Sequence, residues 1–472
     1  MSRPTRLLRA RIQSRWGRKR PRTPARCARP PFFLAGIAAV ATSLFALPSA
    51  HALECPVEAG DCALLVSSGS LAASVDLVIL GDGYTDAERG KFYDDAQAAA
   101  EGLLGSETYS AYAPLFNIWA LFTPSAESGA DDPSEGVFVN TVFNAKYDSF
   151  NIDYLLTVSN SKVLAELGKR FPEHDVPLCL VNATAYGGSG GTVPVVSLDP
   201  SSLEIARHEL GHTIGGLGDE YTEPLPGFPV EDIQPNIASA DHLDPVKWEL
   251  WLTPGVSIPT PIEDATGTLE PVGAYEGAQY QVTGLFRPAP SCLMRELSIP
   301  FCPVCAEAMV KRLSTLSLLI DAPVPPDLSK IPGDAPTTFT ATIPPLADLT
   351  FTWSVDGEPV DAAEKAFALD PAALGLAEGA HSVTLTVYDA TPLVRTDPDS
   401  VMRETFTWNV TVEPGAGTGG GGTGAGGGGG GSSETESSEG GCACHTSGAP
   451  TGSPGAWLFG AAALIALRRR RR

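Results

Sequence analysis

The 472-residue sequence predicts an α/β (α+β) domain with a twisted mixed sheet, followed by a small all-β sandwich of the immunoglobulin-like type. In the first part, apolar runs of strand length alternate with segments of helical period. One of the predicted helices carries an HExxH sequence at residues 208–212. After residue 336 the hydrophobic period changes to two, which is typical of half-buried strands in a β-sandwich.

Composition and charge narrow the class of protein. With 43% hydrophobic and 18% charged residues, the chain is globular in composition and long enough for two or three domains. The formal net charge is −23, and the body is more acidic still because many Lys and Arg residues stand at the two ends. Such a body repels nucleic acid and anionic membranes, so we expect no nucleic-acid partner.

Residues 1–52 are predicted to be a signal peptide. They are rich in Arg, and their apolar run at 32–47 is too short for a convincing membrane span. The A-x-A sequence at 50–52 predicts cleavage after Ala52 and export of the chain. We therefore expect an exported protein.

Export makes the cysteines candidates for structural disulfides. Cys55 and Cys62 are close enough in sequence to close a small loop. The other candidates are Cys179, Cys292, Cys302 and Cys305, and the sequence leaves the pairing open. Cys302-Pro-Val-Cys305 also has the spacing of half a zinc ribbon or of a redox pair, but no second CxxC supports the ribbon. Disulfides are the favoured interpretation.

The predicted domain at 53–320 opens with a strand, a turn and a helix. A Thr85-x-x-Glu88 capping box is expected to begin the helix, which runs to about Leu104. The turn at 81–83 lacks the third glycine of a dinucleotide site. Apolar runs predict four strands, at 75–80, 115–122, 177–182 and 193–197.

The last of these strands leads directly into the HExxH helix. Either this strand, 193–197, or the glycine loop before it, 186–191, is a candidate sheet edge that pairs with an extended peptide. An ordinary internal hairpin is the alternative interpretation of the same residues.

The HExxH helix carries the candidate site. His208 and His212 lie four residues apart, so both imidazoles can reach one metal ion, and Glu209 can meet a metal-bound water. Ser201 and Glu204 form an S-x-x-E pattern that predicts a capping box at its start. Three glycines, Gly215, Gly216 and Gly218, are expected to end the helix and deliver the acidic pair Asp219-Glu220. The alternative is a core helix with two satisfied histidines.

The rest of this domain is less regular. Residues 222–290 are rich in Pro and Gly, and Trp248 and Trp251 are expected in the core or in a wall of the site. Pro303 is expected to begin a helix over 304–318.

The C-terminal third is predicted to hold a linker, a sandwich and a tether. Residues 321–336 are proline-rich and predict a semi-rigid linker. The sandwich is expected over 337–413, with alternating strands at 338–342, 349–355, 382–387 and 405–410 and a hairpin turn at Asp356-Gly357. Residues 414–441 are almost entirely Gly, Ser, Thr and Glu, which predicts a flexible tether.

Taken together, several motifs resemble the IgA metallopeptidase family. They are LVILGDGYT at 77–85, YGGSGG at 186–191, HELGHTIGGLGDEY at 208–221, YEGAQY at 275–280, and RPAPSCLMR through FCPVC at 287–305. The resemblance implies a metzincin-like zinc peptidase with a zincin-like fold and a methionine turn, which Met294 matches. It also implies a Zn²⁺ cofactor held by His208, His212 and Asp219, with Glu220 as the fallback for the third ligand.

One departure from related peptidases concerns the third ligand. Typical metzincins place it six residues after the second histidine, where this chain has Gly218, which has no side chain to offer. The turn that brings Asp219 to the site must therefore differ from the corresponding turn in typical metzincins. The family name records the substrate of a founding member and implies no immunoglobulin specificity here.

The C-terminal segment, 442–472, resembles the MYXO-CTERM sorting signal of myxobacterial surface proteins. It holds Cys442-Ala-Cys444, a short apolar run at 455–467 and five arginines. The resemblance implies attachment at the cell surface (outer membrane), or secretion after processing. A simple C-terminal anchor is the alternative, and in either case the membrane is contacted only through this segment.

The sequence thus predicts an exported zinc-dependent endopeptidase with Glu209 as general base. We expect a polypeptide substrate and a monomer, and Tyr221 or Tyr280 could donate to the oxyanion. Two alternatives remain: a surface-displayed binding or adhesion protein on the same scaffold, and a zinc amidase that acts on cell-wall peptides. The intact Glu209 disfavours the binding protein, which has no use for a general base.

Overall fold

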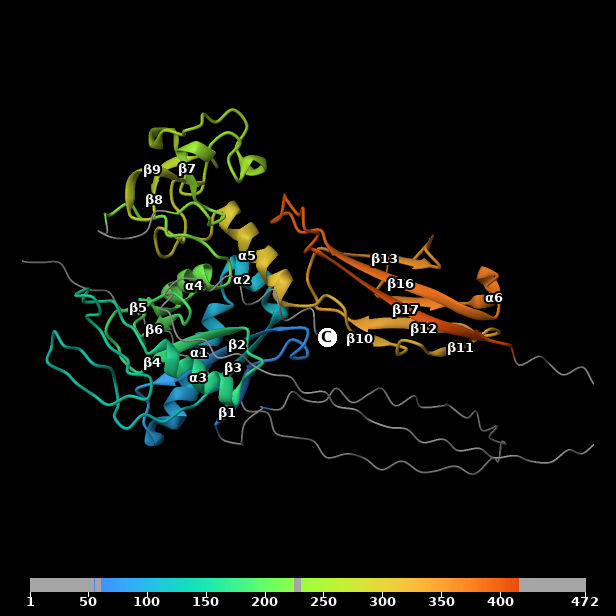
Figure 1. Ribbon diagram of the computed structural model, residues 1–472, viewed down its shortest axis with the longest axis horizontal. Helices are drawn as coiled ribbons and strands as arrows, with labels where there is room; N and C mark the ends of the chain where they lie inside the picture. The colour runs from blue at the N-terminus through green and yellow to red at the C-terminus, as the bar shows by residue number, and fades with distance from the viewer. Residues whose placement is uncertain (1–54, 56–60, 225–230, 363, 416–472) are drawn as a thin grey trace, which may run out of the picture. The chain divides into compact units, whose positions relative to one another are not determined.

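The computed structural model describes residue 55 and residues 61–224, 231–362 and 364–415 (Figure 1). The predicted signal peptide at 1–52, the sorting segment at 442–472 and nearly all of the tether at 414–441 lie outside these residues. Within the described part of the chain, no helix is long and apolar enough to cross a membrane.

A six-stranded mixed sheet forms the centre of the N-terminal part (Figure 1). The strand order is β1-β3-β2-β4-β6-β5; the four inner strands run parallel, and both edge strands pair antiparallel. Their bounds are β1 (Cys62–Val66), β2 (Val75–Asp82), β3 (Phe116–Leu121), β4 (Val176–Val181), β5 (Gly188–Ser189) and β6 (Val195–Val196). The predicted α+β class is confirmed, and each predicted strand of this part matches one observed strand.

Helices cover both faces of this sheet. Side chains alternate along β2, so Leu77 and Ile79 pack on one face with α1, α4 and α5, whereas Val78 and Leu80 pack on the other with α3. The helices are α1 (Arg89–Leu103), α2 (Glu107–Ala111), α3 (Asn160–Arg170), α4 (Ser202–Thr213) and α5 (Pro303–Leu316), with short 3-10 turns η1 (Asp86–Glu88) and η2 (Ala113–Leu115).

The two predicted capping boxes have different outcomes. The Glu88 carboxylate accepts a hydrogen bond from the Thr85 backbone N–H, so the box is present ahead of α1. At α4 the prediction is wrong, because Ser201 has helical backbone angles and its side chain makes no capping bond. There Glu204 pairs with Arg207 instead, since an arginine one turn along the helix competes for its carboxylate.

The segment predicted as irregular, 222–290, holds a small antiparallel sheet. Its order is β7-β9-β8, with β7 (Ala238–Ser239), β8 (Tyr275–Ala278) and β9 (Gln281–Arg287), and three 3-10 turns precede the β8–β9 hairpin: η3 (Ala240–His242), η4 (Glu249–Trp251) and η5 (Ile262–Asp264). Trp248 and Trp251 are buried, as predicted. The hairpin between β8 and β9 turns at Gln279 and Tyr280, both at positive φ.

Two further sheets form the C-terminal part and share one core, which includes Phe339, Trp353 and Trp408. One has the order β10-β12-β15 and the other β11-β17-β16-β13-β14. Their bounds are β10 (Asp321–Val324), β11 (Lys330–Pro332), β12 (Thr337–Thr342), β13 (Leu349–Val355), β14 (Glu358–Val360), β15 (Ala366–Leu369), β16 (Gly379–Asp389) and β17 (Arg403–Glu413), with a short helix α6 (Pro371–Leu374).

The proline-rich segment 321–336, predicted as a linker, is part of these sheets. Strand β10 pairs with β12, and β11 pairs with β17, which buries Ile331. Both strands lie at sheet edges, where proline costs no ladder hydrogen bond, so a proline-rich composition is compatible with sheet structure here.

Candidate metal centre

Helix α4 places two histidines side by side. His208 and His212 are one helical turn apart, and their Nε2 atoms are 3.2 Å from each other. The Nδ1 atom of His208 lies 2.9 Å from the Leu293 carbonyl oxygen, and that of His212 lies 2.7 Å from the Leu217 carbonyl oxygen. Because each Nδ1 faces an acceptor, it carries the ring hydrogen, and both Nε2 lone pairs point at the same space.

Asp219 completes the group from the loop after α4. Its Oδ1 atom lies 3.1 Å from Nε2 of His208 and 3.3 Å from Nε2 of His212. The loop turns at Gly216, at φ +63°, and is then held at Gly218, whose N–H and carbonyl both bond the side-chain amide of Asn236. With Gly218 held in this way, the next residue, Asp219, reaches the histidines.

These three donors fit a zinc ion. Ligands about 2.0–2.1 Å from a tetrahedral zinc ion are about 3.3 Å from one another, and the three observed separations are 3.1–3.3 Å. Burial lowers the pKa of His212, but the Asp219 carboxylate, together with Glu209 and the Leu217 carbonyl, outweighs burial and raises that pKa to about 9. Although burial raises the pKa of Asp219, the two histidines hold it well below its usual range. The space between the three side chains therefore attracts positive charge.

Aromatic and sulfur side chains support this centre. The Tyr221 ring stacks on His208 with centroids 5.6 Å apart. The Tyr280 hydroxyl donates to Oδ2 of Asp219 at 3.1 Å, so this phenol orients the carboxylate. Met294 packs against helix α4 at Gly211. A methyl group on Gly211 would lie 2.7 Å from the Met294 sulfur.

Glu209 lies beside the histidines and against the glycine loop. A methyl group on Gly190 would lie 2.1 Å from Oε2 of Glu209, so any larger residue there requires this carboxylate to move. Burial raises the pKa of Glu209 above its ordinary value, while the neighbouring histidines act in the opposite direction. A carboxylate with a raised pKa is suited to taking a proton near neutral pH.

An open groove of about 950 Å³ runs past the centre. It is lined by the site residues and by the loop 188–191, with Tyr154, Tyr186, Tyr280 and Arg295 among its walls. Strand β5, within that glycine loop, is the sheet edge, and β6 lies inside it. Of the two predicted candidates, the loop therefore holds the edge strand. β5 and β6 also form an antiparallel hairpin, in line with the alternative interpretation, and Leu155 bridges to Gly188.

The other predicted site residue, Glu220, lies elsewhere. Its carboxylate is buried beside Cys292, Cys302 and Cys305, away from the histidines. No spacing in the sequence connects Glu220 with these cysteines. Asn236, which holds the turn at Gly218, also gives no signal in sequence, because it lies in an irregular segment.

The predicted disulfides are found in part. Cys55 and Cys62 are bonded, as expected. Cys179 and the three cysteines near Glu220 are free and buried. Cys179 faces the opposite side of the central sheet, so it is too remote to pair with them.

Comparison with known families shows the class of protein to which this chain belongs. The chain has the sequence pattern of a metallopeptidase family over residues 63–270 and 264–313, which together span more than half of its 472 residues. The family is IgA Peptidase M64, and the chain belongs to it.

The other comparisons add little. The search of curated proteins found no match. Among solved structures, one match is the Bacteroides ovatus mixed-linkage glucan utilization locus protein SGBP-B in complex with a mixed-linkage heptasaccharide. The identity is 20%, the match covers 20% of this chain and 24% of that one, and the TM-score is 0.15. That likeness is too small to carry an argument.

Proposed function

We propose that this protein is an exported zinc-dependent endopeptidase that hydrolyses peptide bonds with Glu209 as general base. The observation that carries the proposal is the separation of 3.1–3.3 Å among His208 Nε2, His212 Nε2 and Asp219 Oδ1. Membership in a peptidase family supports the reaction class. The donor set supports zinc, because two imidazoles and one carboxylate leave a fourth position open.

Zinc bound there would supply a Lewis acid that polarises the scissile carbonyl and acidifies a neighbouring water. Glu209, one residue from His208 and facing the groove, accepts the proton of that water and returns it to the leaving amine. Tyr280 holds Asp219 through its hydroxyl, so its first role is to position a ligand. Tyr221 keeps the His208 ring in place by stacking.

The groove suits an extended polypeptide. Gly190 and Gly191 line it without side chains, so a substrate backbone can approach the edge next to β5. The substrate is a polypeptide of unspecified sequence, and the family name supplies no specificity. We place the protein at the cell surface (outer membrane) or in the medium after processing, on the strength of its predicted N-terminal and C-terminal signals.

The fold supports the same proposal. The mixed sheet with α4 beneath the groove agrees with a zincin-like catalytic domain, and the two C-terminal sheets agree with an immunoglobulin-like sandwich. We assign the sandwich a spacing or binding role, since its described residues hold no candidate metal cluster.

Cleavage of casein by the zinc-loaded chain tests the proposal. The wild type should cleave, lose activity to a chelator and regain it with zinc. Glu209→Gln should bind zinc normally and lose activity by about 10²-fold or more. Glu204→Gln, on the same helix but paired with Arg207, is the matched control and should stay active. Full activity of Glu209→Gln or of the chelated wild type would overturn the proposal.

A further inference from the structure

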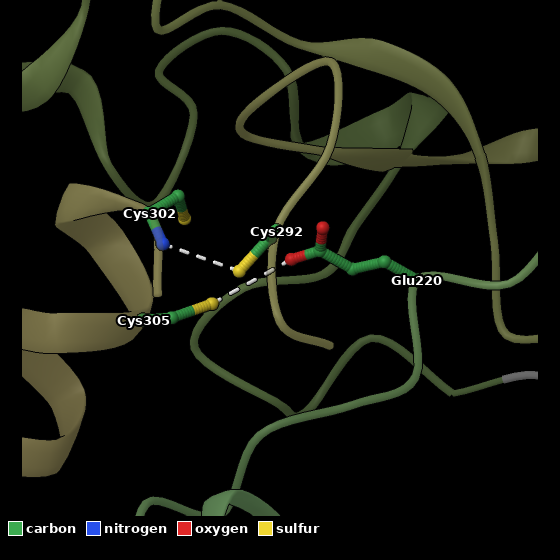
Figure 2. Close-up of side chains that lie close together, drawn as sticks. All are labelled: Glu220, Cys292, Cys302 and Cys305. Atoms are coloured by element: carbon green, nitrogen blue, oxygen red, sulfur yellow. Dashed lines mark hydrogen bonds between the residues drawn. The ribbon is translucent and has the colours of Figure 1, made fainter. Parts of the chain in front are cut away.

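A second group of metal-binding side chains lies next to the first. Glu220, Cys292, Cys302 and Cys305 converge from three segments, and one ligand atom of each lies within 4.8 Å of all the others (Figure 2). Glu220 comes from the loop after α4, Cys292 from the loop after β9, and the CxxC pair from the start of α5. All four residues are buried.

The distance between one sulfur and the carboxylate suits a tetrahedral zinc ion. With Zn–S of about 2.3 Å and Zn–O of about 2.0–2.2 Å, a sulfur and an oxygen ligand should be about 3.5 Å apart. The Cys305 sulfur lies 3.5 Å from Oε1 of Glu220 (Figure 2). The Cys302 backbone N–H donates to the Cys292 sulfur at 3.2 Å, as amides at the start of a helix do toward a thiolate.

A buried oxygen without a partner points to a ligand at the same place. Oε1 of Glu220 accepts a hydrogen bond from the Asn236 amide at 2.9 Å. Oε2 of Glu220 is buried and has no hydrogen-bond partner among the described residues. A buried carboxylate oxygen that lacks a partner is costly, and the charge of a cation bound by this carboxylate would offset part of that cost.

Disulfide bonding does not account for the group. Three cysteines allow only one disulfide, which would leave one buried thiol beside a buried carboxylate. A disulfide is present elsewhere, at Cys55–Cys62, whereas these three sulfurs are unpaired.

We propose that Glu220, Cys292, Cys302 and Cys305 form a second, structural zinc site. Four protein ligands and full burial leave no open position, which distinguishes a structural site from a catalytic one. Three thiolates, one carboxylate and Zn²⁺ carry a net charge of −2, as a four-cysteine site does. Arg295 lies close enough to balance part of it, since its guanidinium donates to the Glu220 carbonyl at 2.7 Å.

The second site would fix parts of the first. The Glu220 N–H donates to the Met294 carbonyl at 2.8 Å, and Glu220 directly follows Asp219. Cys292 directly precedes Leu293, whose carbonyl holds His208. A metal ion here would therefore join the segment that carries Asp219, the Met294 turn and helix α5, so its ligands act as positioning residues.

Metal content and cobalt spectroscopy of the full exported chain test this proposal. The wild type should hold two zinc ions, and after replacement by cobalt it should show the thiolate-to-cobalt charge-transfer absorption that only a cysteine site gives. Cys302→Ser should hold one metal ion and lose this absorption. Cys179→Ala removes a buried thiol on the opposite face of the sheet. This variant should keep both metal ions and the charge-transfer absorption.

The outcomes separate this proposal from the peptidase function. His212→Ala should lose one zinc ion and all cleavage but keep the charge-transfer absorption. No charge-transfer absorption in the wild type, or a disulfide among these three cysteines by mass spectrometry, would overturn the second site. One metal ion per wild-type chain together with this absorption would instead overturn the zinc centre of the proposed peptidase. The measurements on the wild type decide the matter even if Cys302→Ser does not fold.

Discussion

Asp219 and Glu220 are neighbours in the chain, but their carboxylates belong to two different clusters. Oδ1 of Asp219 is 3.1 Å from Nε2 of His208, whereas Oε1 of Glu220 is 3.5 Å from the sulfur of Cys305. The choice between these two acids as the third ligand of the HExxH centre therefore depends on the turn at Gly216 and Gly218.

Asp219→Asn should weaken zinc binding at the centre by at least about 100-fold, because losing a ligand should cost more than losing a residue that only orients one. Cleavage should fall with it at limiting zinc. A chelator competition measures the affinity. Glu223→Gln changes another carboxylate that lines the groove and should leave the affinity unchanged. Normal zinc affinity in Asp219→Asn would show that a different residue is the third ligand.

Tyr280→Phe should lower zinc affinity by about 10-fold to 100-fold, because it removes the hydroxyl that orients Asp219. Tyr221→Phe keeps the ring that stacks on His208 and should have a smaller effect. The same titration, together with kcat at saturating zinc, distinguishes the roles. A fall in kcat with unchanged zinc affinity would instead make Tyr280 a donor to the oxyanion, as the sequence allowed.

Gly190→Ala should displace the Glu209 carboxylate and reduce kcat, while zinc content stays at the wild-type level. Gly168→Ala is the matched control. It lies in helix α3 with nothing within 4 Å of the added methyl group, and it should stabilise the fold by up to about 1 kcal/mol. Undiminished kcat in Gly190→Ala would mean that the contact with Glu209 has no part in catalysis.

The free energy of unfolding should depend on pH through Asp76. Burial raises the pKa of Asp76 to about 7, and hydrogen bonds from Trp119 and Asn117 only partly oppose this. The folded state therefore holds a proton that the unfolded state releases, so this group lowers stability as pH rises from its ordinary pKa of 3.8 to about 7.

Asp76→Asn cannot ionise and should lose this dependence. Relative to the wild type, the variant should gain about 1.4 kcal/mol for each pH unit across that window. Denaturant unfolding at about pH 5 and about pH 8 measures the difference. If the free energies of unfolding of the variant and the wild type differ by the same amount at both pH values, the pH dependence does not come from Asp76.

Much of the fold could be predicted because the signals are local. The apolar runs of β2, β3 and β4 are buried along their whole length, so strand length and burial are visible in sequence. HExxH spacing likewise places two imidazoles on one helical face by geometry alone.

Other features depend on partners that are distant in the chain. The segment 321–336 has the composition of a linker, and only pairing with β12 and β17 makes it part of two sheets. Ser201 and Glu204 fit a capping box, but Arg207 takes the carboxylate. Glu220 lies 72 or more residues from the cysteines that surround it, so no spacing rule could connect them.

X-ray anomalous scattering at the zinc edge, from crystals of the wild-type chain, would locate the metal ion itself. We expect a zinc peak bonded to His208 Nε2, His212 Nε2 and a carboxylate oxygen of Asp219. A zinc-loaded, proteolytically active crystal with no peak among these three side chains would contradict it.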